Sequence, residues 1–125
     1  MTASLLDLYF LSPLFWTLLL LPNMEMATTQ QVADFYEVSV DTIKTVLKRN
    51  KTELKSDGFV NGSGKFVKVN LTSTEIQQKQ GYFLITDNQG NEVKVNNVRN
   101  SLFPKRAILR VGMLLRDSEV AKEVR

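Results

Sequence analysis

The pattern of hydrophobic and polar residues divides the chain after Met26 into three parts. Residues 28–55 carry apolar side chains at the three- and four-residue spacing of amphipathic helices. Residues 58–98 are rich in valine, phenylalanine, glycine and asparagine, which is typical of short strands joined by turns. Residues 103–125 return to helical spacing. The pattern predicts an α+β fold with N-terminal helices, central β-hairpins and C-terminal helices.

The first part is expected to contain two short helices. Thr28 can cap the first helix, with Gln31 completing a capping box, and Ser39 can cap the second. A turn at Glu37 and Val38 joins them. The expected inward residues are Val32, Ala33 and Tyr36 on the first helix and Ile43, Val46 and Leu47 on the second. This order, with a small residue where the helices cross, predicts a helix-turn-helix within residues 24–57.

The outward face of the second helix is polar and becomes basic toward its end. A short helix of this kind fits a DNA major groove, with small polar residues near base edges and cations near phosphates. The predicted DNA-binding residues are Ser39, Asp41, Thr42, Lys44, Thr45, Lys48 and Arg49. Lys48 and Arg49 have a second interpretation, in which they only complement the negative end of the helix dipole.

One residue departs from the usual helix-turn-helix pattern. Glu37 stands where many such turns place glycine, because the backbone there adopts a left-handed conformation. A residue other than glycine in that conformation costs about 1 kcal/mol.

Two hairpins are expected in residues 58–100. In the first, a turn at 61–64 joins Phe59-Val60 to an alternating strand at 65–71. With Lys65 and Lys68 it is either a wing that touches DNA or a plain surface hairpin. The second joins residues 82–86 to 92–95, and a helical turn at 73–78 lies between the hairpins.

The last part, residues 101–125, is expected to be helical after Phe103-Pro104. Its apolar stripe comprises Ile108, Val111, Leu114 and Leu115. Asp117 or Ser118 can cap a further short helix that reaches Arg125. Because no capping signal follows, we expect the natural protein to continue beyond Arg125.

Two segments carry a family resemblance. Residues 28–50 follow the pattern Thr-x-x-x-Val-Ala-x-x-Tyr-x-Val-Ser-x-x-Thr-Ile-x-x-x-x-x-Arg-Asn. This resembles the helix-turn-helix of bacterial and phage transcriptional regulators. Residues 102–121 resemble a segment of prophage and plasmid regulators of Gram-positive bacteria that are often labelled antirepressor-like. The resemblance implies transcription regulation in the cytoplasm of a bacterial cell, with the gene carried by a phage or another mobile element.

Charge and composition narrow the function further. The net charge is +3, and all sixteen basic residues follow Ile43, which permits nucleic-acid binding. Further candidate phosphate contacts are Lys51, Lys65, Lys105, Arg106 and Arg110, although Arg106 and Arg110 can equally be solvated on one helix face.

The chain has no cysteine and no histidine, which excludes disulfides, the usual zinc sites and histidine-based catalysis. Residues 87–91 are similar to the start of a calcium-binding loop, but the distal glutamate of such a loop is absent. We therefore interpret them as a turn. We therefore expect that the protein is not an enzyme and that it binds neither a metal ion nor a cofactor.

Residues 1–23 differ from the rest of the chain, with an apolar stretch at 5–21 broken by Pro13. Four interpretations are open: a membrane segment, a secretory signal, a buried or partner-binding helix, and upstream sequence before a true start at Met24 or Met26. The uncharged stretch is shorter than the roughly 20 residues that a membrane span needs, and no basic n-region marks a signal peptide. The change in composition at residues 22–24 favours the fourth interpretation.

Together these features predict a sequence-specific regulator that binds duplex DNA as a dimer, because one short helix reads too few base pairs. The alternative is a protein-interaction module, an antirepressor or phage inhibitor that sequesters a regulator protein. That module would be membrane-associated if residues 5–21 act as an anchor.

Overall fold

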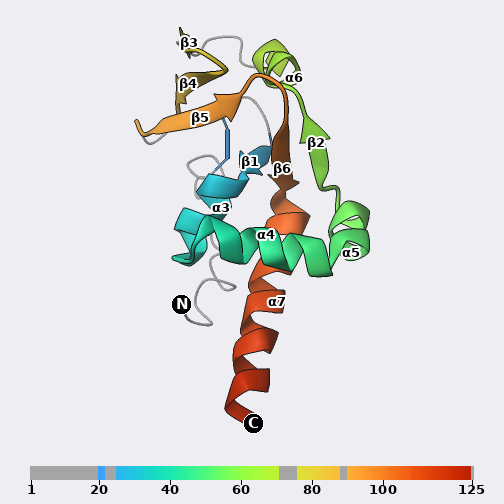
Figure 1. The fold of residues 1–125 in the computed structure, drawn as a ribbon. Coiled ribbons are helices and arrows are strands. Elements are labelled where there is room, and N and C mark those ends of the chain that lie inside the picture. The colour runs from blue at the N-terminus through green and yellow to red at the C-terminus, as the bar shows by residue number, and fades with distance from the viewer. Residues whose placement is uncertain (1–19, 22–24, 71–75, 88–89, 125) are drawn as a thin grey trace.

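The computed structural model of the chain describes residues 20–21, 25–70, 76–87 and 90–124. The fold is mixed α+β, as the sequence predicts, with five helices and two three-stranded antiparallel sheets in the described ranges (Figure 1). The helices are α3 (Thr29–Tyr36), α4 (Val40–Arg49), α5 (Lys51–Ser56), α6 (Gly64–Asn70) and α7 (Lys105–Val124). The strands are β1 (Met26–Thr28), β2 (Val60–Gly62), β3 (Ile76–Gln78), β4 (Tyr82–Thr86), β5 (Glu92–Asn96) and β6 (Asn100–Pro104).

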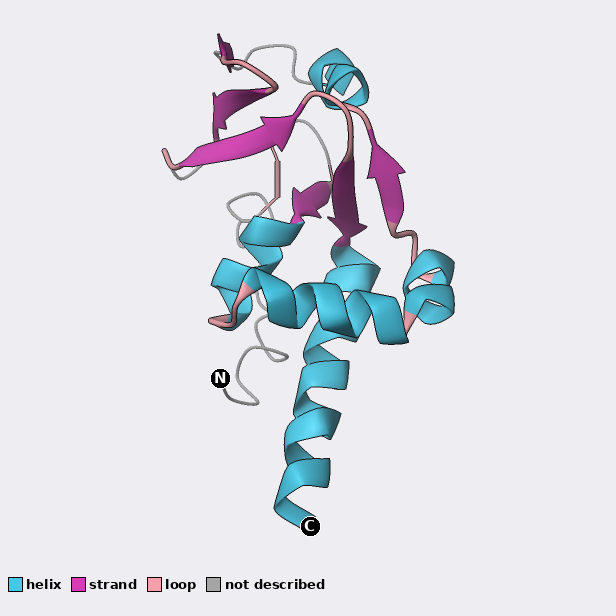
Figure 2. Cartoon of the chain, viewed as in Figure 1, coloured by secondary structure: helices cyan, strands magenta, loops and turns pink. Residues whose placement is uncertain are grey.

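The first sheet has the strand order β1-β6-β2 and holds the helices together. Strands β1 and β2 flank the three helices α3, α4 and α5 in the sequence, and both pair with β6. Met26 lies opposite Pro104, and Val60 lies opposite Leu102. The chain between β2 and β6 forms α6 and the second sheet. Figure 2 shows α6 among the strands, whereas the other helices gather at the opposite end.

The second sheet has the order β3-β4-β5 and confirms the second predicted hairpin. Strands β4 and β5 pair from Tyr82 opposite Asn96 to Thr86 opposite Glu92. Their inward side chains alternate along each strand, as a half-buried sheet requires, and are Phe83, Ile85, Val93 and Val95.

The first predicted hairpin is wrong. Residues 64–70 form helix α6 instead of a strand, and β2 pairs with β6. The Ser63 hydroxyl accepts the N–H of Phe66 at 3.1 Å, which is a helix-capping bond. The side chains of Phe66 and the buried Leu102 both lie against Gly62, where a Cβ atom would be 2.9 Å from each. Local capping and packing on β6 therefore override the alternating pattern.

Two smaller expectations also fail. Ile76–Gln78 is strand β3, so the predicted helical turn at 73–78 is wrong there, and residues 71–75 lie outside the described ranges. Helix α7 runs unbroken from Lys105 to Val124, so no separate helix begins after Asp117 or Ser118. No glycine or proline follows Gly112 to interrupt it. In Figure 1 its C-terminal turns extend away from the sheets.

Two hydrophobic clusters meet at β6. Phe103 points into a cluster shared by the helices, and Leu102 points into a cluster beneath the second sheet. The helical cluster includes Val32, Ala33, Tyr36, Ile43, Leu54, Ile108 and Val111. Leu20 belongs to this cluster and Leu21 to the other, and the N–H of Leu21 donates to the carbonyl of Met26 at 2.8 Å.

Helices α3 and α7 cross where one has a tyrosine and the other a glycine. The buried Tyr36 hydroxyl donates to the carbonyl of Ile108 at 2.6 Å. Burial raises the pKa of this hydroxyl above its ordinary value. A Cβ atom at Gly112 would lie 2.5 Å from the Tyr36 oxygen, so only glycine permits this approach.

Candidate nucleic-acid interface

Local capping sets the positions of α3 and α4. The Thr28 hydroxyl accepts the N–H of Gln31 at 3.3 Å, and the Gln31 side chain accepts the N–H of Thr28 at 2.9 Å. This confirms the predicted capping box. The Ser39 hydroxyl accepts the N–H of Thr42 at 3.1 Å and so caps α4 as predicted. The two helices are thus joined by a turn of only three residues.

The turn between the helices contains the expected left-handed residue. Glu37 has φ 57°, and no other non-glycine residue in the described ranges has a positive φ. Its N–H and that of Val38 donate to carbonyls near the end of α3, at Asp34 and Ala33, which holds the sharp turn.

Replacing Glu37 with glycine should therefore stabilise the protein. Relief of the left-handed strain is worth about 1 kcal/mol, partly offset by the greater backbone freedom of glycine when unfolded. We expect a gain of roughly 0.5 kcal/mol in the free energy of unfolding by denaturant titration. Glu37→Ala, which removes the same side chain and keeps the strain, is the control. An equal gain in both variants would mean that the glutamate side chain, and not the backbone, is responsible.

Packing on the helical cluster fixes which side of α4 faces out. Ile43 is fully buried, and Val46 and Leu47 are partly buried against the same cluster. Helix α4 contacts both α3 and α7. The opposite side of α4 is therefore held in a fixed orientation toward solvent.

The predicted DNA-binding residues lie together on this outer side. Thr42 is half-buried, and the other six, Ser39, Asp41, Lys44, Thr45, Lys48 and Arg49, are exposed. The hydroxyl groups are already engaged within the helix: Ser39 and Thr42 lie 2.9 Å apart, and Thr45 donates to the carbonyl of Asp41 at 3.0 Å. The charged side chains are consequently the groups most available to a ligand.

Exposed cations follow one another along the sequence from α4 into α5. Lys44, Lys48, Lys51 and Lys55 are all exposed and follow one another at spacings of four, three and four residues. Together with Arg49, none of them forms a salt bridge within the described ranges. Lys55 was missed in the sequence interpretation, although its helical spacing from Lys51 is a usable signal.

Three other predicted phosphate contacts form salt bridges. Arg110 donates to the carboxylate of Asp57 at 2.8 Å, and Arg106 lies 3.5 Å from the same carboxylate. The Asp57 side chain is only 5% exposed, and its hydrogen bond and charge raise the pKa of Arg110. This cluster ties the end of α5 to α7. Lys105 lies 4.0 Å from Glu25.

Lys65 is exposed on α6, away from the cations of α4 and α5. Figure 1 shows α6 and α5 near opposite ends of β2. The structure therefore brings Lys51 next to α4 and leaves Lys65 at the end of the molecule that holds the second sheet.

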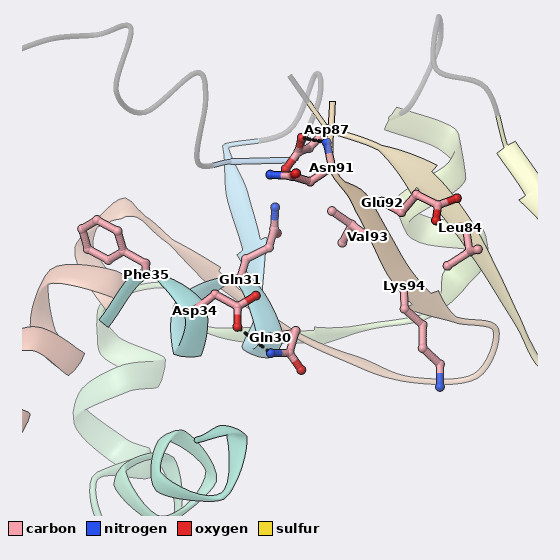
Figure 3. Close-up of a pocket in the computed structure, with 10 residues that line it drawn as sticks. All are labelled: Gln30, Gln31, Asp34, Phe35, Leu84, Asp87, Asn91, Glu92, Val93 and Lys94. Carbon is pink, nitrogen blue, oxygen red and sulfur yellow. Dashed lines mark hydrogen bonds between the residues drawn. The ribbon is translucent and has the colours of Figure 1, made fainter. Parts of the chain in front are cut away.

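A shallow groove of about 430 Å³ lies between α3 and the β4–β5 hairpin (Figure 3). Asp34 accepts a hydrogen bond from Gln30 at 2.8 Å, and Asp87 accepts one from the N–H of Asn91 at 2.8 Å. The ammonium group of Lys94 lies 4.6 Å from the ring centre of Tyr82. These polar groups form bonds with near neighbours. They do not converge on one point, whereas the groups of a catalytic site must do so.

Within the described ranges, no group of three or more acidic side chains is placed to hold a metal ion. No helix in those ranges has both the length and the hydropathy needed to cross a membrane. Comparisons with protein-family models, curated proteins and solved structures find no match. The geometry of α3, α4 and α5 is thus the main guide to function.

Proposed function

We propose that this protein is a sequence-specific duplex-DNA-binding regulator of the helix-turn-helix type, with α4 as the helix that enters the major groove. One observation carries the proposal. Helix α4, held from behind by Ile43, presents a polar outer face whose cations have no acidic partner among the described residues. Such a face suits a polyanion with a groove as wide as a helix.

The position of each group along α4 suggests its role. Asp41, Thr42 and Lys44 lie in the first half of the helix, where side chains meet base edges in this mode of docking. Lysine pairs with guanine, aspartate with the amino group of cytosine, and threonine with either kind of base edge. Lys48, Arg49 and Lys51 follow at the far end and would contact phosphates, which supply affinity without sequence preference.

The first sheet supports the same proposal. The pair β2–β6 stands beside the helices as a winged arrangement requires, although α6 and the second sheet occupy the place of a simple wing tip. A single short helix reads few base pairs, so the protein would act as a dimer on two half-sites. This function needs no cofactor. The protein would bind DNA in the cytoplasm of a bacterial cell.

Substitution on α4 tests the proposal. The double variant Lys48→Ala/Arg49→Ala should bind all duplexes at least about tenfold more weakly, because two phosphate contacts are lost. Thr42→Ala and Lys44→Ala should instead change the preference among sequences. Selection from a random duplex library followed by fluorescence anisotropy measures both effects.

Arg106→Ala/Lys105→Ala is the matched control, since it removes the same charge from side chains that pair with Asp57 and Glu25. It should reduce binding much less than the α4 variant. Equal binding by wild type and every α4 variant, all folded, would contradict the proposal.

A second candidate function is a protein-interaction module that sequesters a regulator. The observation in its favour is a set of exposed apolar side chains, Phe66 and Val69 on α6 and Val60 on β2, which are typical of protein contacts. A module of this kind would not bind duplex DNA of random sequence at low salt. A membrane-associated form depends on residues 5–21, of which only Leu20 and Leu21 fall within the described ranges.

A further inference from the structure

The turn between β5 and β6 displays an apolar side chain to solvent. Val98 in this turn is 84% exposed, the highest value among the large exposed hydrophobic residues of the described ranges. A β-branched apolar residue contributes nothing to the core when it stands this far out. Its neighbour Arg99 is exposed as well.

Hydrogen bonds from three other segments fix the backbone of this turn. The buried Asn100 side chain accepts the N–H of Asn96 at 2.8 Å and donates to the carbonyls of Asn96 at 2.9 Å and Gly62 at 3.2 Å. Asn97 donates to the carbonyl of Gly81 at 3.0 Å and accepts the N–H of Gly64 at 2.9 Å. Val98 is therefore held in place on a rigid support.

Close packing adds to this rigidity. A Cβ atom at Gly64 would lie 2.8 Å from the carbonyl oxygen of Asn96 and 2.9 Å from the Cα atom of Asn97. The start of α6 consequently sits directly against the turn. Lys65, the next residue of α6, is exposed beside it.

The surroundings of the turn are basic. Neither Lys65 nor Arg99 forms a salt bridge with any residue that the structure describes. Lys68 on α6 lies 2.7 Å from the side-chain oxygen of Gln78 and 4.7 Å from the ring centre of Phe83. Gln78 in turn lies 3.4 Å from the Asn97 side chain. Cations and amides thus surround the turn that carries Val98.

We infer that this turn is a second DNA contact, in which Arg99 and Lys65 bind phosphates and Val98 packs against deoxyribose carbons. The inference rests on the proposed function and adds a contact remote from α4. A polyanion matches the unpaired cations, and the sugar-phosphate backbone offers apolar carbon between its charges. Because the turn is already rigid, binding would cost little conformational freedom. Figure 1 shows it beside α6, with β6 leading from it toward the helices.

Three single variants of the full chain, each lowering the net charge by one, test this contact. Val98→Asp places a negative charge where phosphate should lie, and Arg99→Ala removes a phosphate contact. Arg116→Ala is the control, because Arg116 is exposed and belongs to α7, which Figure 1 shows extending away from the sheets. Anisotropy with a random duplex of about 20 base pairs, two helical turns, is measured across a salt series.

We expect Val98→Asp to weaken binding about tenfold or more, and Arg99→Ala to weaken it severalfold and reduce the salt slope by about one. Arg116→Ala should change affinity less than twofold in the same measurement. All three substitutions are at exposed side chains, so thermal melts should match wild type.

The outcomes separate this inference from the function on which it rests. If Lys48→Ala/Arg49→Ala loses binding but Val98→Asp and Arg99→Ala behave like Arg116→Ala, the second contact is refuted and the role of α4 stands. If the folded wild-type chain binds no duplex at low salt, the proposed function fails and the second contact fails with it.

Discussion

A chain that begins at Met24 should be about 4 kcal/mol less stable than the full chain, because it lacks two core leucines. Leu20 is 5% exposed and Leu21 is 1% exposed, and they belong to different hydrophobic clusters. Complete burial of one leucine stabilises a fold by about 2 kcal/mol, and the cavities left behind add to the loss. The backbone bond from Leu21 to Met26 is lost as well.

Chemical denaturation of chains that begin at Leu20 and at Met24 measures this difference. The chain from Leu20 should keep the stability of the two leucines, and the full chain carrying Leu20→Ala/Leu21→Ala should resemble the chain from Met24. Equal stability of all these chains would contradict the packing of Leu20 and Leu21.

Replacing Gly112 with alanine should destabilise the protein by about 2 kcal/mol, even though alanine is the better helix former. The new methyl group would lie 2.5 Å from the Tyr36 oxygen and 2.9 Å from two ring carbons. Overpacking of this kind costs about 1–3 kcal/mol. The displaced ring would also lose its 2.6 Å hydrogen bond to Ile108, worth about 1 kcal/mol. These losses exceed the gain of about 1 kcal/mol in helix propensity.

A double-mutant cycle with Tyr36→Phe isolates this contact. Phenylalanine removes the oxygen that is closest to the new methyl group, so Gly112→Ala should cost less in that background, with a coupling of about 1 kcal/mol. Thermal or chemical unfolding of the four chains provides the values. Additive effects would show that the crossing of α3 and α7 is looser than the structure has it.

The parts of the fold that follow from the sequence are those with local causes. The capping residues Thr28 and Ser39 and the left-handed Glu37 act within a few neighbours, so the two helices and their turn could be predicted. The second hairpin has its turn between adjacent strands, which is also a local signal.

The errors in the fold come from distant partners. Strand β2 pairs with β6, although α6 and the second sheet lie between them in the sequence. No residue near β2 gives a local signal for that pairing. If that pairing is not known, the alternating apolar and polar residues after Gly64 predict the second strand of a hairpin. The Ser63 cap and the packing of Val67 make this segment a helix instead. Helix α7 continued past Asp117 because a possible cap does not by itself stop a helix.

The candidate site divides in the same way. The cations of α4 could be identified because helical spacing puts them on one face. The pairing of Arg110 with Asp57, and the support of the Val98 turn by Asn100, join residues that are distant in the chain or depend on the exact path of the backbone. Side chains of that kind become visible only once the fold is known.

Fluorescence anisotropy of the full chain with random duplex DNA, titrated from low to moderate salt, is the most direct test of DNA binding by this protein. We expect binding at low salt, with an association constant whose logarithm falls linearly with the logarithm of salt concentration. The slope should have a magnitude of roughly three or more, from the cations of α4 and α5. That slope should decrease in Lys48→Ala/Arg49→Ala. A folded protein that binds no duplex at low salt, or binds with no dependence on salt, would contradict the proposed DNA binding.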